Sequence, residues 1–228
     1  SHEIIAQVLN PQNYLKKKDT RISNVVFMGM GEPLLNESAV YDACDLLLDD
    51  WAFGLSRRKV TVSSSGIVPA LYRMADTIPV SLAISLHAPS DKLRDVLVPI
   101  NQKYPIKELM KACKYYLNAG TQERHIFFEY VMLDGVNDLP EHAKSLARLL
   151  KGISAKVNLI PFNPFPKTQY QTSKEVTINQ FQNILYRSGI RTTTRRTRGD
   201  DVDAACGQLA GKVLDKSKRN VGRHQVLS

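Results

Sequence analysis

Short apolar runs alternate with longer amphipathic segments along the 228 residues of the chain. The short runs are rich in Val, Ile and Phe, whereas the longer segments repeat their apolar positions every three or four residues. This alternation is typical of strand-then-helix units around a parallel sheet. We predict six strands, at 24–30, 59–63, 80–86, 125–133, 156–161 and 191–195.

The segments between these strands carry helical patterns. Ser38 and Asp91 are predicted to cap two of the helices, and Pro140 is expected in a first helical turn. Because the strands are apolar almost throughout, they are suited to burial on both faces, which favours an α/β fold with a curved parallel sheet, a partial (β/α)6 barrel. The predicted helices lie at 38–51, 68–75, 91–97, 106–119, 140–152 and 177–188.

The first residues, 1–9, form a helical pattern with no strand before it. In an α/β architecture we therefore expect a first strand upstream, so that 1–228 is one domain incomplete at its N-terminus, with a basic segment from about 191 within it. No stretch approaches the roughly 20 apolar residues of a membrane span, and the opening lacks a secretory signal. We expect a cytoplasmic protein with no membrane partner.

The charge is unbalanced, with a formal net charge of +9. The excess gathers from Arg187 onward, where ten Lys and Arg residues face four Asp residues. Such a balance favours a polyanionic partner, because neutralising phosphates drives that kind of binding. A basic surface that serves only solubility is the alternative.

Three cysteines stand far apart, at Cys44, Cys113 and Cys206, which is neither a disulfide framework nor a metal-ligand cluster. Cys44 and Cys113 lie within predicted helices in core-like contexts. Cys206 lies in the first turn of a helix predicted to begin near Ala204, where the positive helix terminus lowers a thiol pKa. A reactive thiol and an inert buried cysteine both remain open there.

Parallel α/β sheets place their sites at the carboxyl ends of the strands. After the first strand, Gly31 allows a close backbone approach and Glu32 offers a carboxylate that could hold an ammonium group. The next strands end in a serine run at 63–65 and in SLHA at 85–88, and Asn163 lies in a proline-rich loop after the fifth. Each segment alone also fits an ordinary turn or a structural side chain.

Taken together, four segments resemble the radical S-adenosylmethionine (SAM) adenine C2-methyltransferases that act on 23S rRNA and tRNA. They are GMGEPL at 29–34, SLHA at 85–88, IPFNP at 160–164, and RGDD at 198–201 running into ACGQL at 205–209. The resemblance implies that Cys206 carries the methyl group: it receives a methyl from one SAM, and a radical derived from a second SAM activates that methyl for addition to adenine. It also implies a SAM pocket formed by Gly31, Glu32, Ser63, Ser85, Leu86, His87 and Asn163.

The resemblance further implies a [4Fe-4S] cluster bound by a Cys-x3-Cys-x2-Cys motif. That motif is absent from this sequence, so no metal ligand is expected in this chain and the cluster cysteines are expected upstream. A second catalytic cysteine and a small accessory domain are expected there as well. We therefore expect this chain alone to be inactive.

The same resemblance implies 23S rRNA and tRNA as partners, together with an electron donor such as flavodoxin. A monomer is the default expectation for the oligomeric state. Two alternatives remain open, a radical SAM rRNA adenine C8-methyltransferase and a non-catalytic basic α/β module that binds RNA. RNA phosphates are expected to meet Arg191, Arg195, Arg196 and Arg198, together with the tail residues Lys216, Lys218, Arg219 and Arg223. Arg57, Arg58 and Lys59 form a further candidate patch.

Overall fold

The computed structural model describes residues 1–29, 31–119, 124–165 and 168–195. Within these residues all six predicted strands form, and they pair in chain order as one sheet. Every pairing is parallel. The strands are β1 (Val25–Phe27), β2 (Val60–Ser64), β3 (Ser81–Ser85), β4 (Ile126–Met132), β5 (Ala155–Pro161) and β6 (Arg191–Thr194).

The helices after β1 match the predicted segments to within a few residues. They are α2 (Glu37–Leu48), α3 (Val68–Thr77), α4 (Asp91–Leu97), α5 (Ile106–Asn118), α6 (Pro140–Leu149) and α7 (Glu175–Arg187). Three short 3-10 segments accompany them, η1 (Pro33–Leu35), η2 (Arg57–Lys59) and η3 (Pro99–Gln102). Pro140 does occupy the first turn of its helix, as predicted.

Three local predictions were wrong. The first helix, α1 (His2–Lys16), runs well past residue 9 and contains a proline. The helices α2 and α4 begin after Asn36 and Ser90, and neither has a side-chain cap. Asp91 instead accepts a hydrogen bond from the backbone N–H of Ile106, which opens the next helix.

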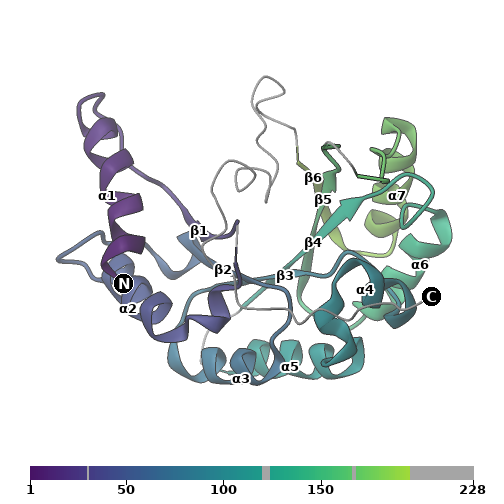
Figure 1. Ribbon diagram of the computed structural model, residues 1–228, viewed down its shortest axis with the longest axis horizontal. Coiled ribbons are helices and arrows are strands. Elements are labelled where there is room, and N and C mark those ends of the chain that lie inside the picture. Colours follow the sequence, from purple (N-terminus) through teal and green to yellow (C-terminus); the bar gives the residue numbers. More distant parts are fainter. Residues whose placement is uncertain (30, 120–123, 166–167, 196–228) are drawn as a thin grey trace, which may run out of the picture.

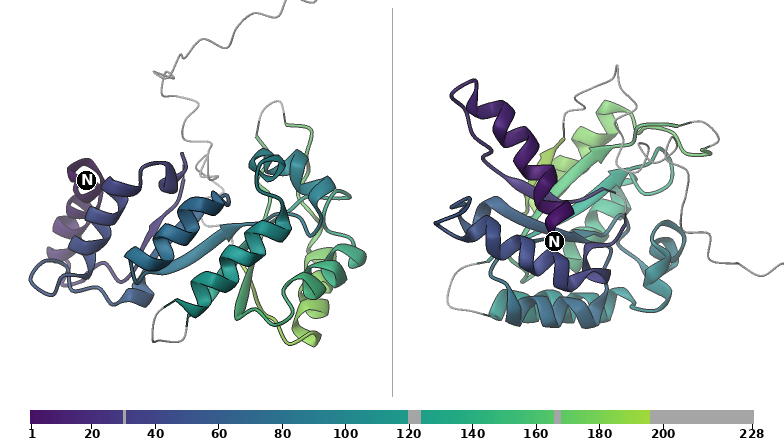
Figure 2. Two further views of the ribbon diagram at one scale, coloured as in Figure 1. Left: turned by 90° about the horizontal axis from the view of Figure 1, so that it is seen from below. Right: turned by 60° about the vertical axis from the view of Figure 1, so that its left-hand side comes forward.

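The sheet is strongly curved and does not close into a barrel (Figure 1). Helices α2, α3, α5, α6 and α7 line its convex side, and α1 stands beside the β1 edge. The views in Figure 2 show the same single layer of helices against the sheet. The predicted fold class, an α/β fold with an open, partial barrel of six parallel strands, is confirmed.

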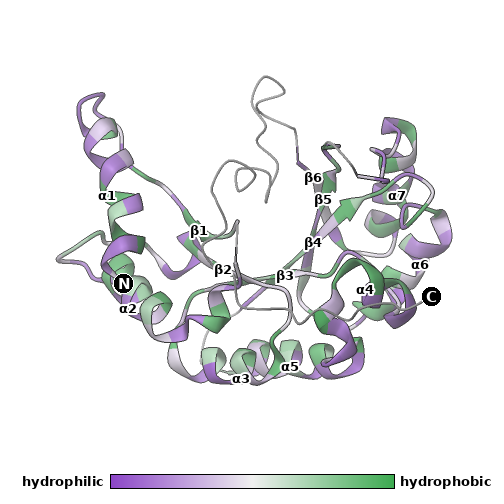
Figure 3. Ribbon diagram, in the orientation of Figure 1, coloured by the Kyte–Doolittle hydropathy of each residue, from purple (hydrophilic) through white to green (hydrophobic). Residues whose placement is uncertain are grey.

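The core lies between the sheet and the convex-side helices. Alternate strand residues such as Val62, Ile84, Phe128 and Val157 face the helices and have no exposed area. Figure 3 shows hydrophobic and hydrophilic residues interleaved along these helices, as expected for elements with one buried face. Among the described residues, no helix has the length and apolar character that a membrane crossing requires.

The other alternate residues face the concave side of the sheet, and several of them are polar. One register row crosses four neighbouring strands and carries Ser85, Glu129, Asn158 and Thr193. We call these four residues the polar row. A parallel sheet normally buries apolar side chains on both faces, so this polar surface marks the concave side as the place to look for a site.

Candidate functional site

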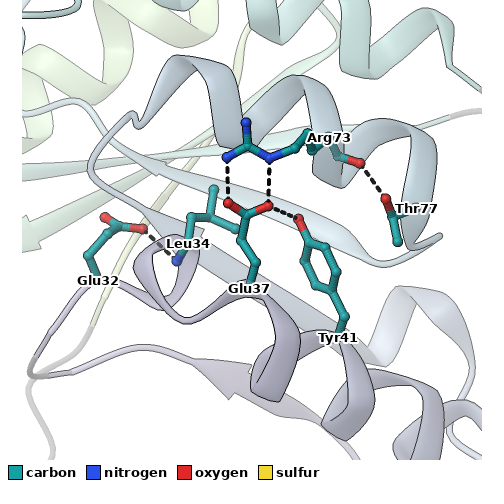
Figure 4. Close-up of polar contacts among 6 residues, drawn as sticks. All are labelled: Glu32, Leu34, Glu37, Tyr41, Arg73 and Thr77. Atoms are coloured by element: carbon teal, nitrogen blue, oxygen red, sulfur yellow. Dashed lines mark hydrogen bonds and ion pairs between the residues drawn. The ribbon is translucent and has the colours of Figure 1, made fainter.

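Glu32 is held firmly at the end of β1. Its Oε2 atom accepts hydrogen bonds of 2.7 Å from both the backbone N–H and the hydroxyl of Ser65. Its Oε1 atom accepts a 3.1 Å bond from the N–H of Leu34, a contact drawn in Figure 4. A carboxylate has about four acceptor positions, so at least one remains for a ligand. Gly31 precedes it at φ +88°, a conformation that favours glycine, and a Cβ there would meet open space.

An ion pair joins α2, the helix that follows the segment carrying Glu32, to α3. Arg73 donates through Nε and Nη2 to the two carboxylate oxygens of Glu37, at 2.9 and 2.5 Å. The hydroxyl of Tyr41 donates to the same carboxylate, as Figure 4 shows. The Arg73 bonds lower the pKa of Glu37, so this carboxylate is ionised and the pair is formed at neutral pH. The pair joins the helices that follow β1 and β2.

Ser63 and Ser85 both face the concave side of the sheet, near the ends of β2 and β3. Ser63 is buried and Ser85 is partly exposed. The side chain of Leu86 lies in the core. Its backbone N–H donates to the carbonyl of Glu129, and its own carbonyl accepts from Arg94. We call the edge of the sheet that carries Glu32, Ser63, Ser85 and His87 the rim. Leu86 shapes this rim through its backbone.

His87 adopts a left-handed backbone conformation, with φ +59°. Its Nδ1 atom accepts a 3.2 Å hydrogen bond from the N–H of Val131, so the ring proton resides on Nε2, which remains available as a donor. Burial, and secondarily the cation of Arg94, lowers the pKa of His87 to about 4. The imidazole is therefore neutral at physiological pH.

The fully buried Asn137 holds this histidine in its unusual backbone conformation. Its Nδ2 atom donates to the carbonyls of His87 and Val131, at 2.9 and 2.6 Å. Its Oδ1 atom accepts from the N–H of Leu133 at 2.8 Å. These bonds fasten the loop after β3 to the end of β4, and they offset the strain of a non-glycine residue at positive φ.

Glu129 is the central member of the polar row and is only 7% exposed. The amide of Asn158 donates to its Oε1 at 2.9 Å, and the hydroxyl of Thr193 donates to the amide oxygen of Asn158 at 2.5 Å. Burial raises the pKa of Glu129, while the Asn158 bond and the Arg195 cation act in the opposite direction. A buried acceptor group thus lies on the concave face beside Ser85.

Sequence reasoning missed Ser65, Glu129, Asn137 and Asn158 as members of the site. Two of them carried a usable signal, because a charged residue and an amide interrupt strands that are otherwise apolar. Ser65 belonged to the serine run but was not singled out from it. Asn137 lies in a loop whose bonds to the neighbouring strand ends become visible only with the fold in hand.

The remaining predicted site residues are spread over the β5 and β6 end of the sheet. Asn163 is exposed in the loop after β5, while Arg191 and Arg195 are exposed at the start of β6 and just after it. The patch Arg57, Arg58 and Lys59 is exposed immediately before β2, at the opposite end of the strands from the rim. Outside the described residues lie Arg196, Arg198, Cys206 and the tail residues Lys216, Lys218, Arg219 and Arg223.

Cys44 and Cys113 are buried in α2 and α5, as predicted. Burial raises the pKa of both thiols to about 12, which leaves them unreactive at neutral pH. In the part of the chain that the structure describes, no group of His, Cys, Asp or Glu side chains could hold a metal ion. These residues therefore do not fit an iron–sulfur cluster.

The rim does fit SAM. An oriented carboxylate on Glu32 suits the ammonium group of an amino acid, and the open space beside Gly31 admits a ligand close to the backbone. The hydroxyls of Ser63 and Ser85 and the Nε2–H of His87 add donors along the same rim. Carboxylate, hydroxyl and neutral imidazole together match the amino acid and ribose parts of such a molecule.

Two curated proteins similar to this chain are both called dual-specificity RNA methyltransferase RlmN. The protein of Ruthia magnifica subsp. Calyptogena magnifica is 73% identical over 221 residues, and that of Vesicomyosocius okutanii subsp. Calyptogena okutanii is 72% identical over 223 residues. Both alignments cover 97% of this chain. The chain spans 62% and 63% of the length of these relatives.

Among solved structures, a radical SAM methyltransferase from Sphaerobacter thermophilus superposes with a TM-score of 0.85 at 43% identity, over 90% of this chain and 60% of that one. A domain of a pyruvate-formate lyase-activating enzyme from Bacteroides vulgatus shares the fold, with a TM-score of 0.56 at 18% identity, over 76% of this chain and 99% of that one. The profile of the radical SAM superfamily matches residues 5–150, more than half of the sequence. The chain therefore belongs to the radical SAM superfamily.

Proposed function

We propose that the full-length protein methylates carbon 2 of adenine in 23S rRNA and tRNA, with Cys206 as the methyl carrier. The observation that supports this most directly is the 72–73% identity to dual-specificity RNA methyltransferases over 97% of the chain. The family resemblance carried by the four motifs quoted above supports the choice of adenine as the base, carbon 2 as the target and Cys206 as the carrier. The polar rim and its neutral histidine suit the cofactor such an enzyme needs.

In this proposal each described rim residue has a defined task. Glu32 binds the ammonium group of SAM, and Gly31 lets the backbone approach it. The rest of SAM is hydrogen-bonded by three donors, the hydroxyls of Ser63 and Ser85 and the Nε2–H of His87. The amide of Asn163 hydrogen-bonds the edge of the adenine of SAM. SAM, together with a cluster bound by cysteines upstream of this chain, supplies the methyl group and the radical chemistry.

A carrier thiol is needed because of the chemistry of the target carbon. Carbon 2 of adenine is electron-poor and its hydrogen is barely acidic, so an ordinary methyl cation donor finds no nucleophile there. A methyl group on the Cys206 sulfur would instead lose one hydrogen atom to the radical derived from SAM, and the resulting carbon-centred radical would add to carbon 2. The second cysteine expected upstream would then help to release the product from the Cys206 sulfur. Cys44 and Cys113 are unsuited to this task, because their thiols are buried and carry pKa values of about 12.

The RNA must present its adenine out of the base stack to reach such a site. Arg191 and Arg195 are exposed at the β6 edge of the sheet, where they would neutralise phosphates without reading sequence. We extend the same role to Arg196 and Arg198. We also propose flavodoxin as the electron donor, a monomer as the working state and the cytoplasm as the location.

The test is nucleoside mass spectrometry of 23S rRNA and tRNA treated with the full-length, cluster-containing protein, SAM and a reductant. We expect 2-methyladenosine in both RNAs with the wild type and with Cys113→Ala, and none with Cys206→Ala. Formation of 8-methyladenosine would support the C8-methyltransferase instead. RNA binding without any methylated product, unchanged by Cys206→Ala, would support the non-catalytic module.

A further inference from the structure

Arg94 is a buried cation that the site described above does not use. It lies on α4, its side chain is fully buried, and it forms no ion pair with any described residue. Its guanidinium donates instead to three backbone carbonyls: Nη2 to Ser65 at 2.6 Å and to Ser85 at 3.1 Å, and Nε to Leu86 at 3.1 Å. Such an arrangement needs a reason, because burying a charge is costly.

The three carbonyls lie where the sheet ladder ends. β2 ends at Ser64 and β3 at Ser85, so the carbonyls around these ends have lost the regular donors of a neighbouring strand. A buried carbonyl without a donor is costly, because it has lost its bonds to water and gained none in return. One planar guanidinium, with its donors in a fixed fork, satisfies all three carbonyls at once.

The charge of Arg94 is balanced through an intermediary. Its Nη1 atom donates to the side-chain oxygen of Asn101 at 2.9 Å, and the Asn101 amide in turn donates to the carboxylates of Asp91 and Asp95, at 2.9 and 2.6 Å. Asn101 is itself buried and lies on η3. Burial lowers the pKa of Arg94 to about 10, so the group is still a cation at neutral pH.

The bonds of Arg94 reach the candidate SAM rim directly. Ser65 links Arg94 to Glu32. Its carbonyl accepts a hydrogen bond from Arg94, while its N–H and hydroxyl donate to the carboxylate of Glu32. The Ser85 and Leu86 carbonyls, also held by Arg94, lead straight into His87. One side chain thus connects the segments that follow β1, β2 and β3.

We propose that Arg94 is a positioning residue for SAM: it fixes Glu32, through Ser65, and the segment 85–87 at the mutual placement that the cofactor requires. The inference rests on the proposed use of this rim for SAM. Arg94 does not touch the cofactor; it acts through Ser65, Ser85 and Leu86. A lysine at this position would keep the charge but, as a point donor on a flexible chain, could not hold three carbonyls in a fixed plane.

The experiment compares Arg94→Lys with Arg124→Lys in the full-length protein carrying its cluster. Arg124 serves as the control. It lies just before β4, away from the rim, and its Nη1 also donates to backbone carbonyls, those of Tyr116 at 3.1 Å and Ala75 at 3.4 Å. The dissociation constant of S-adenosylhomocysteine is measured for both variants, together with the melting temperature and the KM and kcat for SAM.

We expect Arg94→Lys to weaken S-adenosylhomocysteine binding and raise the KM for SAM about 10- to 100-fold, by analogy with the loss of residues that orient the ligands of a metal site. The kcat at saturating SAM should fall much less. Arg124→Lys should also lower the melting temperature but leave ligand affinity unchanged. A purely structural arginine would not produce this split between the two variants.

Equal affinities in Arg94→Lys and Arg124→Lys would overturn the proposal. If Arg94→Lys does not fold, Asn101→Ala decides, because without the Asn101 bond to Nη1 the guanidinium plane is no longer fixed against the three carbonyls. The affinity for S-adenosylhomocysteine should then fall, and unchanged affinity in that variant would equally overturn the proposal. The dissociation constant of S-adenosylhomocysteine is measured without any RNA methylation taking place. A wild type that binds S-adenosylhomocysteine but methylates no RNA would therefore count against the proposed function and leave the test of Arg94 intact.

Discussion

At the scale of single residues, burial determines the protonation states that the site offers. His87 is neutral and donates from Nε2, because its Nδ1 is occupied by the Val131 N–H and its pKa is about 4. Burial raises the pKa of Glu129, while the Asn158 bond and the Arg195 cation act against that rise. The neutral imidazole donor of His87 and the oriented carboxylate of Glu32 suit a zwitterionic ligand better than they suit a proton transfer.

The lowered pKa of His87 predicts a loss of stability in mild acid. An exposed histidine in the unfolded chain titrates near 6.5, so the unfolded state binds more protons below that pH and folding weakens as pH falls from 6.5 through 4. Between pH 7 and 5 this group should cost about 2 kcal/mol of unfolding free energy. Asparagine tolerates the positive φ, so His87→Asn is a suitable variant. Its unfolding free energy, measured in urea, should fall by about 2 kcal/mol less than that of the wild type between pH 7 and 5. Parallel losses in wild type and variant would contradict the assignment.

At the scale of elements, the loops after the strands are fastened by side chains that lie outside the regular structure. Asn137 joins the loop after β3 to the end of β4, and Ser65 joins the end of β2 to Glu32. The ion pair of Arg73 and Glu37 joins α2 to α3 on the outer surface. The rim is thus held by specific hydrogen bonds to neighbouring elements.

Asn137→Ala should be among the more damaging single changes. It leaves buried groups of His87, Val131 and Leu133 without partners, which predicts a loss of about 3 kcal/mol in unfolding free energy. The exposed Asn183 on α7 is the control, and Asn183→Ala should change stability by less than about 0.5 kcal/mol. Chemical denaturation of both variants measures the difference; a similar small effect in both would show that Asn137 is dispensable.

The elements themselves were predictable from the sequence, because apolar runs and helical periodicity report burial directly. The caps were not: Asp91 looked like a helix cap, but in the fold its carboxylate serves Ile106 and Asn101. Arg94 could not be recognised either. Its partners are backbone carbonyls at the ends of two different strands, and only the register of the sheet brings these together.

At the scale of the whole molecule, the open sheet separates two surfaces with different roles. Helices cover the convex side, while the concave side presents the polar row and the rim (Figure 1). The strand ends pointed to Glu32, to the serine run at 63–65 and to the segment 85–87, because parallel strands end at the same edge. The choice of Ser63 within the serine run came from the family resemblance. Glu129 was not, since its place beside Ser85 depends on the pairing of β3 with β4.

This separation predicts where RNA phosphates bind. Replacing both Arg191 and Arg195 by Ala should weaken RNA binding and reduce the slope of log affinity against log salt by about 1 per arginine. Replacing Lys107 and Lys114, exposed on the convex-side helix α5, removes the same charge and should leave the slope unchanged. Equal changes in the two double variants would mean that RNA attraction depends on net charge and that the β6 edge is not a docking surface.

The most direct test of the central claim is peptide mass spectrometry of the full-length protein, produced with its cluster and with SAM, in search of a methyl group on cysteine. Cys44 and Cys113 are internal controls, because their buried thiols have pKa values of about 12. We predict one added methyl group on the peptide containing Cys206 and none on the other two. An unmodified Cys206 in cluster-replete, SAM-supplied protein would contradict the proposed methyl carrier and would favour a module that binds RNA without catalysis.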